Sequence, residues 1–283
     1  MSERATDGPA VRRILVALDA AAHDPALLDA AAALAARLGA ELIGLFVEDL
    51  NLLRSAGLPF VRQVSFLTAC AEDFDAPTTE RELRVMAERA ERRLAAAAHE
   101  NGVKYSFRVV RGHVAHEVSA AAEEADLVIV EESARPLTRH LRLPAPCRDA
   151  TLQVSRSVLL YRRGADTEGP ISVVYDGSPE ADQALAMAGK LTGDGERGLE
   201  ILLVPSPVAR GADLEHRARQ RLIDHRGEVH MRALGPAGLP QIGRLLRDVG
   251  AGLVVLHGSC AAARGAEIES IIKDLGCPVL LLR

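Results

Sequence analysis

Two aspartates, Asp19 and Asp176, stand at equivalent places in this sequence, each directly after a short run of β-branched and other apolar residues. The first run is RILVAL (13–18) and the second is ISVVY (171–175). A carboxylate at the C-terminal end of a parallel strand points into the crevice where open α/β sheets bind ligands. Both aspartates are therefore candidates for ligand contact. The alternative is that each one caps the following helix or shapes the turn before it.

Other reactive side chains lack partners at a useful spacing. His113 and His116, with Glu117, could present two imidazoles to a metal, but no further ligands follow, so a surface pair at a helix start is favoured and no metal site is predicted. His257 lies at the expected crevice, where the favoured interpretation is a loop histidine in place of an apolar residue. Cys277 is expected to be a small buried side chain. No Ser/His/Asp or Cys/His signature occurs, so no catalytic residue is predicted and the protein is not expected to be an enzyme.

The elements that position these residues follow from the apolar pattern. Apolar residues at three- and four-residue spacing predict a helix over 26–38, and Thr79 and Glu82 are spaced as a capping box for a long helix over 79–100. Another helix is expected after Gly112, through residue 124. Short apolar or alternating runs predict the strands of this half, which are 14–18, 41–47, 105–110, 127–130 and 158–161.

The second half of the sequence repeats this order of elements. Its expected strands are 171–175, 199–204, 228–233, 252–256 and 279–282, and its expected helices are 179–191, 213–223, 239–249 and 266–275. Alternating strands and helices predict an α/β fold with two repeated, doubly wound domains, each a mostly parallel five-stranded sheet with helices on both faces. The predicted domains are 12–162 and 170–283, joined by a linker over 163–170.

Length and composition limit the function. A chain of 283 residues fits two domains, and a net charge of −5 argues against nucleic-acid binding, which needs concentrated Lys and Arg. The four cysteines form no CxxC pair and no secretory signal opens the chain, so a cytoplasmic location is expected. The apolar stretch 26–47 contains Asp29, Arg37 and Glu41, whose charges would be costly in lipid, so no membrane partner is expected.

Residues 50–78 form the one segment of the first half that has no counterpart in the second half. They contain Phe60, Phe66 and Phe74, three of the five phenylalanines of the chain. A long segment with this apolar content should cover a sheet edge, fill the seam between the domains or meet a partner. Packing within the chain is favoured, and an unidentified protein partner is the alternative.

Both halves resemble the universal stress protein family, and the resemblance covers roughly residues 12–283. In the second half it rests on DGSPE (176–180) followed by an Ala-rich helix, and on GCPVLLL (276–282). In the first half it rests on ILVALD (14–19), GAEL (39–42) and Arg111-Gly112, although Asp19 is followed by Ala-Ala where the family has Gly-Ser. The resemblance implies a fold like that of the adenine nucleotide alpha hydrolases.

The resemblance also implies a nucleotide site. In many family members the Asp contacts the adenine side, a Val of the second strand lines the base pocket, and a loop of the form G-x2-G-x9-G-[S/T] holds the phosphates. The corresponding residues are Asp19 and Val47 in the first half and Asp176, Val204, Gly258, Ser259 and Gly265 in the second. Glycines allow backbone amides to approach an anion closely.

The phosphate loops depart from this family pattern. In the second half Ala261 stands in place of the second Gly, Gly265-Ala266 lacks the hydroxyl, and the loop is several residues short. In the first half Glu131 stands in place of the first Gly, and the carboxylates of Glu131 and Glu132 would repel phosphate unless Arg135, Arg139 or Arg142 compensates. Pro144 near the end of that loop offers no amide. No cofactor is therefore expected, with ATP or another adenine nucleotide as the alternative.

The leading hypothesis is a non-catalytic stress-response protein that acts through protein contacts or senses a ligand. The alternative is an adenine-nucleotide-binding protein with weak ATPase activity through its second domain. In the family the last strand often pairs across a dimer, and the apolar runs 158–161 and 279–282 need covering. We therefore predict that the two halves form an internal pseudo-dimer, and a homodimer of whole chains stays open.

Overall fold

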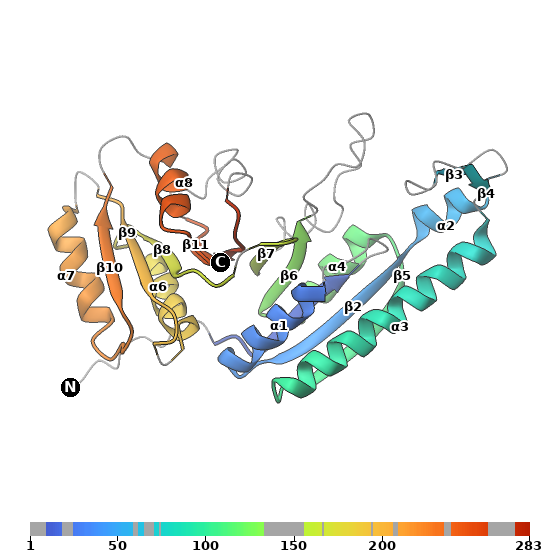
Figure 1. Ribbon diagram of the computed structural model, residues 1–283, viewed down its shortest axis with the longest axis horizontal. Coiled ribbons are helices and arrows are strands. Elements are labelled where there is room, and N and C mark those ends of the chain that lie inside the picture. The colour runs from blue at the N-terminus through green and yellow to red at the C-terminus, as the bar shows by residue number, and fades with distance from the viewer. Residues whose placement is uncertain are drawn as a thin grey trace.

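The computed structural model in Figure 1 describes eleven stretches of the chain. They are residues 10–18, 25–58, 62–64, 71–73, 75–132, 156–165, 167–193, 195–205, 209–234, 239–259 and 275–283. Several expected features lie outside these stretches: Asp19, Gly265, both phosphate loops beyond residues 132 and 259, and residues 266–274 of the expected helix over 266–275.

One ten-stranded sheet runs through both halves of the chain. Its order is β10-β9-β8-β11-β12-β7-β6-β1-β2-β5, and all neighbours are parallel except β12 and β7. Each half contributes five strands with its first strand in the middle. The strands are β1 (Arg13–Leu18), β2 (Glu41–Asp49), β5 (Tyr105–Gly112), β6 (Leu127–Glu132), β7 (Ser157–Arg162), β8 (Ile171–Tyr175), β9 (Leu199–Leu203), β10 (Val229–Ala233), β11 (Leu253–His257) and β12 (Val279–Leu282).

The two sets of five parallel strands meet where β12 pairs antiparallel with β7. Leu280 lies opposite Leu159, with Val279 opposite Leu160 and Leu281 opposite Val158. All six side chains are buried, so neither apolar strand leaves an open edge. In Figure 1 the first half, in blue and green, and the second half, in yellow to red, lie on either side of this junction.

Helices cover both faces of the sheet. One buried core joins the sheet to α1 (Pro25–Leu38), α3 (Ala76–Glu100), α6 (Pro179–Leu191) and α7 (Gly211–Arg221), and the other joins it to α4 (Val114–Ala122) and α8 (Leu239–Asp248). The predicted α/β class, with a large and mostly parallel sheet between helices, is confirmed. None of the helices described is long and apolar enough to cross a membrane.

The long helix α3 begins earlier than the sequence predicts, and the predicted capping box is wrong. Asp75 is the N-cap, because its Oδ1 accepts a hydrogen bond from Thr78 N at 2.9 Å. Thr79 lies inside the helix, where its hydroxyl donates to Asp75 O at 2.8 Å. Asp is among the strongest N-caps and Pro77 suits the first turn, so these two residues decide where the helix starts.

The segment 50–78 carries elements of its own in its described residues. Helix α2 (Leu50–Ala56) is capped by Asp49, whose Oδ1 accepts from Asn51 N at 2.8 Å, and it packs against α3 and β2. Strands β3 (Arg62–Val64) and β4 (Ala71–Asp73) pair antiparallel. The three phenylalanines of the segment lie outside the described residues, so a partner surface here stays a prediction.

Candidate functional site

Four residues from the predicted nucleotide site lie at one edge of the second half's sheet. Asp176 follows β8, Val204 follows β9, and Gly258 and Ser259 follow β11; β8 lies between the other two strands. Because these strands are parallel, their carboxyl ends meet at the same edge, where open α/β sheets bind ligands. The sequence prediction that Asp176 stands at this edge therefore holds in the structure.

A chain of polar contacts links Asp176 to β11 at this edge. His257 is the last residue of β11, and its Nε2 lies 3.5 Å from Asp176 Oδ2. The other ring nitrogen, Nδ1, lies 2.9 Å from the hydroxyl oxygen of Ser259. The imidazole is only 2% exposed. The interpretation of His257 as a loop residue is wrong, because it ends a strand and contacts the candidate carboxylate.

The other oxygen of Asp176 shapes the turn that leads into α6. Oδ1 accepts a hydrogen bond from Ser178 N at 3.0 Å, and Ser178 Oγ in turn accepts from Ala181 N at 3.1 Å. Ser178 is therefore the N-cap, while Asp176 fixes the turn before it. Between them Gly177 has a φ of +78°, which other L-residues rarely adopt. The alternative role predicted for Asp176, shaping the turn before the helix, is therefore present in the structure.

These contacts keep Asp176 ionised. The contact with His257 is the largest cause that lowers the pKa of Asp176 below its ordinary value of 3.8; the Ser178 hydrogen bonds add to it, and partial burial opposes it. Ser178 N donates to one carboxylate oxygen, and His257 Nε2 lies 3.5 Å from the other. A ligand that binds this carboxylate would compete with these two groups for it.

The lowered pKa of Asp176 predicts a pH-dependent contribution to stability. A carboxylate whose pKa falls on folding stabilises the folded state above its unfolded pKa, and that contribution disappears as the pH falls toward the folded pKa. Asp176→Asn should therefore lower the free energy of unfolding by about 1–3 kcal/mol at pH 7, with the loss shrinking below about pH 4. Urea unfolding of both proteins between about pH 3 and pH 7 measures this loss.

The matched control is Asp213→Asn, which removes an exposed carboxylate from the first turn of α7. Its effect should be within about 0.5 kcal/mol at neutral pH, as for most exposed substitutions. A loss for Asp176→Asn that stays constant from neutral to acid pH would show that the charge of Asp176 is not what stabilises the fold.

The remaining predicted residues lie apart from this chain of contacts. Val47 is fully buried within β2, in the core that includes α4. Val204 donates its backbone N–H to Tyr175 O at 2.8 Å, and Gly258 donates to Leu282 O at 2.8 Å. Glu131, expected to repel phosphate, has its Oε1 2.8 Å from Nε of Arg163, which is not one of the three arginines expected to compensate its charge.

Within the described residues, the histidine pair of the first half gains no further metal ligands. His116 is 78% exposed, with Nδ1 3.2 Å from Glu117 Oε1, and His113 is the N-cap of α4 without a side-chain cap bond. Across the described stretches of the chain, no group of three or more His, Cys, Asp or Glu side chains could hold a metal ion. Cys277 is 6% exposed, as expected for a buried small side chain.

Solved structures share this architecture along nearly the whole chain. A universal stress protein from Archaeoglobus fulgidus DSM 4304 is 17% identical with a TM-score of 0.69, and the match covers 95% of this chain and 96% of that one. A protein of unknown function from Pseudomonas aeruginosa PAO1 is 18% identical with a TM-score of 0.59, covering 96% and 92%. A putative universal stress protein from Pseudomonas aeruginosa UCBPP-PA14 is 19% identical with a TM-score of 0.58, covering 96% and 93%. At such identities these likenesses show the fold alone.

The family follows from a match between this sequence and a family model. Comparison with curated proteins finds no match. The model of the universal stress protein family matches residues 10–162, more than half of the chain. This match falls on the first half, where the motif resemblance is the weaker of the two. The chain belongs to the universal stress protein family.

Proposed function

We propose that this protein is a non-catalytic universal stress protein with two domains, 12–162 and 170–283, which acts in the cytoplasmic stress response through protein contacts or by sensing a ligand. In this proposal neither half holds ATP tightly. Residues 50–78 are the proposed surface for a protein partner, and the two halves serve each other as an internal pseudo-dimer.

The main support for this proposal is that groups of the protein itself contact both carboxylate oxygens of Asp176. In the family pattern this aspartate contacts the adenine side of the nucleotide. Here His257 Nε2 lies 3.5 Å from one carboxylate oxygen, and Ser178 N donates to the other at 3.0 Å. The shortened loop after Ser259 lacks the second glycine and the hydroxyl that would support phosphates. Both ends of a nucleotide would therefore lose contacts.

Two features support the internal pairing. Both halves place their strands in the same order, and β12 pairs with β7 through buried leucine and valine side chains. Across the junction, Arg37 at the end of α1 donates to Leu191 O at the end of α6, with a distance of 2.6 Å. A cation at the C-terminus of a helix is stabilised by the helix dipole. The contacts that would join two chains are thus present within one.

Nucleotide binding tests this proposal directly. Protein purified without added nucleotide and then denatured should release no stoichiometric adenine nucleotide on chromatography. Calorimetric titration with ATP and Mg²⁺ should give a Kd weaker than about 1 mM, equivalent to about −4 kcal/mol. The variant Asp176→Ala should leave that weak binding unchanged, because the carboxylate already has its partners.

A stoichiometric ATP or AMP peak, or micromolar binding that Asp176→Ala abolishes, would contradict the proposal. That result would favour the alternative, an adenine-nucleotide-binding protein with weak ATPase activity through its second domain. Phosphate release from ATP, compared between the natural protein and Asp176→Ala, then distinguishes binding from hydrolysis.

A further inference from the structure

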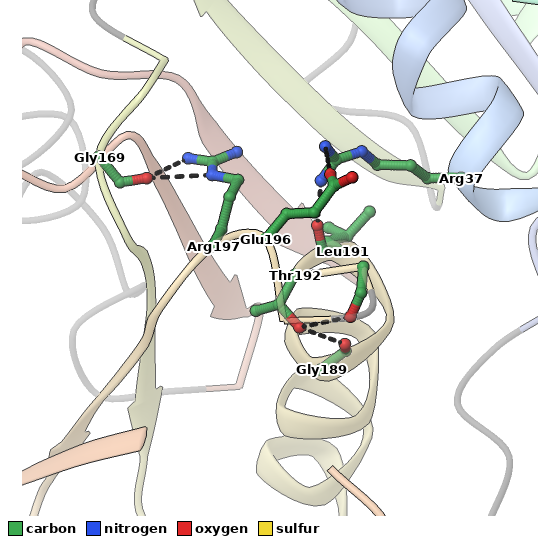
Figure 2. Close-up of polar contacts among 8 residues, drawn as sticks. Arg37, Gly169, Gly189, Leu191, Thr192, Glu196 and Arg197 are labelled. Atoms are coloured by element: carbon green, nitrogen blue, oxygen red, sulfur yellow. Dashed lines mark hydrogen bonds and ion pairs between the residues drawn. The ribbon is translucent and has the colours of Figure 1, made fainter. Parts of the chain in front are cut away.

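The junction between the two halves is already closed by pairing within the chain. Strands β7 and β12 meet there, and Arg37 braces the junction, since its Nη1 donates to Leu191 O and its Nη2 lies 3.1 Å from Glu196 Oε2. Figure 2 shows this arginine reaching the end of α6. The sheet can therefore be extended only at its two ends, which in the described stretches of the chain are β10 and β5.

Of these two edge strands, β5 is the longer and the one with exposed apolar side chains. It has eight residues, whereas β10 has five. Side chains two residues apart in a strand point to the same face, so Tyr105, Phe107 and Val109 form one row, which we call the apolar row. Phe107 packs against the core that includes α3, whereas Tyr105 is 43% and Val109 is 49% exposed. No large apolar side chain of β10 is exposed to this extent.

The backbone groups of the apolar row point away from the rest of the sheet. Leu42 N of β2 donates a hydrogen bond to Lys104 O, just before β5, at 2.9 Å. Backbone groups of successive residues in a strand point to opposite sides, so the even-numbered residues of β5 bond to β2 and the odd-numbered ones point outward. The N–H and C=O groups of the apolar row are therefore directed at the outer edge, where a further strand could bond to them.

The charged side chains of β5 are balanced by carboxylates of the same chain. Arg108 Nη2 lies 2.6 Å from Glu124 Oε2. Arg111 Nε lies 2.8 Å from Glu48 Oε2, and its Nη1 lies 3.0 Å from Glu80 Oε1. Charged residues on an edge strand normally oppose the approach of a second strand. Because both arginines have carboxylate partners, this protection is reduced at β5.

We propose that β5 pairs antiparallel with β5 of a second copy of the chain, about a two-fold axis through Phe107. In this register Tyr105 of one copy lies opposite Val109 of the other, so the apolar row covers its own counterpart. The outward backbone groups of the two copies then face each other and can bond. The contact is small, so the dimer is weak, with a Kd of about 10–100 µM. It does not depend on nucleotide binding at Asp176.

The charges of β5 favour this register over the adjacent ones. With the axis at Phe107, Arg108 lies opposite Ser106 of the second copy. An axis at Arg108 would place this arginine opposite its own counterpart, and an axis at Ser106 would place it opposite Lys104. Like charges directly opposite each other on a sheet are destabilising. Pairing about Phe107 avoids both arrangements.

Sedimentation velocity of the full chain tests the dimer. Between about 1 and 300 µM, the weight-average mass of the natural protein should rise from that of one chain toward that of two. Val109→Lys should weaken dimerisation by about tenfold or more, because it places an ammonium group opposite Tyr105 and lysine on an edge strand opposes pairing. The matched control is Val85→Lys, the same change at an exposed residue of α3, which should dimerise as the natural protein does. Circular dichroism checks that both variants are folded.

Disulfide cross-linking tests the register. The Cα atoms of two opposite, hydrogen-bonded residues are about 5.5 Å apart, which a disulfide can span. Tyr105→Cys and Val109→Cys proteins, mixed and oxidised, should therefore give more cross-linked dimer than either variant alone, with the natural protein as background for its own cysteines.

Three results would overturn the proposal. The first is a natural protein that stays monomeric at about 300 µM, well above the expected Kd. The second is a dimer that Val109→Lys leaves intact or that Val85→Lys weakens equally, because the contact would then not depend on β5. The third is cross-linking of Tyr105→Cys or Val109→Cys alone that equals that of the mixture, because the two strands would then not pair about Phe107.

Discussion

Replacing Arg232 with Met should lower the free energy of unfolding by about 3 kcal/mol, because it leaves a buried carboxylate without its cation. Glu200 lies in β9 and is 2% exposed. Its Oε1 is 2.6 Å from Nε of Arg232, on the neighbouring strand β10. Breaking a buried ion pair from one side costs about 3–5 kcal/mol, and the half-exposed Arg232 side of the pair places the expected loss at the lower end.

The double variant Arg232→Met with Glu200→Leu separates this cause from a general effect of changing β10. With both charges gone, the double variant should recover most of the lost stability, since an apolar pair of similar volume is often as stable as a buried ion pair. Denaturation with urea measures all of these variants.

The matched control for the ion pair is Arg219→Met, which breaks the exposed pair of Arg219 with Glu215 at 2.6 Å on α7. That loss should be below about 0.5 kcal/mol. If Arg219→Met and Arg232→Met cost the same, burial of Glu200 would not be the cause.

The sequence predicts the order and type of the elements well because local patterns determine them. The run 279–282 is apolar throughout and the run 171–175 is apolar except for Ser172, and they are β12 and β8 with every residue buried. Helix 179–191 is α6 to the residue, since Ser178 and Pro179 together mark its start. The start of α3 was missed because two capping signals compete there, and Asp75 with Pro77 prevails over Thr79 with Glu82.

The candidate site is only partly predictable, because its contacts join residues from different strands. The pattern places Asp176 at the end of its strand, and this position follows from local sequence alone. The contact of His257 with Asp176 depends on β11 lying next to β8, with Leu253 opposite Ile171. In the same way, Arg37 contacts Leu191 only because the two halves meet at β7 and β12. No local pattern encodes these pairings.

Gly169→Ala is the second substitution with a large expected effect, a loss of about 3 kcal/mol in the free energy of unfolding. A Cβ at Gly169 would lie 1.8 Å from Gly250 O and 2.8 Å from Gly252 N. These are backbone atoms, so no side chain can rotate away to make room. The linker also accepts a hydrogen bond here, from Gly252 N to Pro170 O at 2.9 Å. The substitution must therefore separate the linker from the turn before β11.

Gly276→Ala is the control for Gly169→Ala, because a Cβ at Gly276 would meet no atom within 4 Å and the residue has an ordinary φ. Its stability, measured by thermal unfolding, should equal or slightly exceed that of the natural protein, since Ala reduces the entropy of the unfolded chain. A Gly169→Ala protein as stable as Gly276→Ala would mean that the linker does not lie in close contact with the backbone of Gly250.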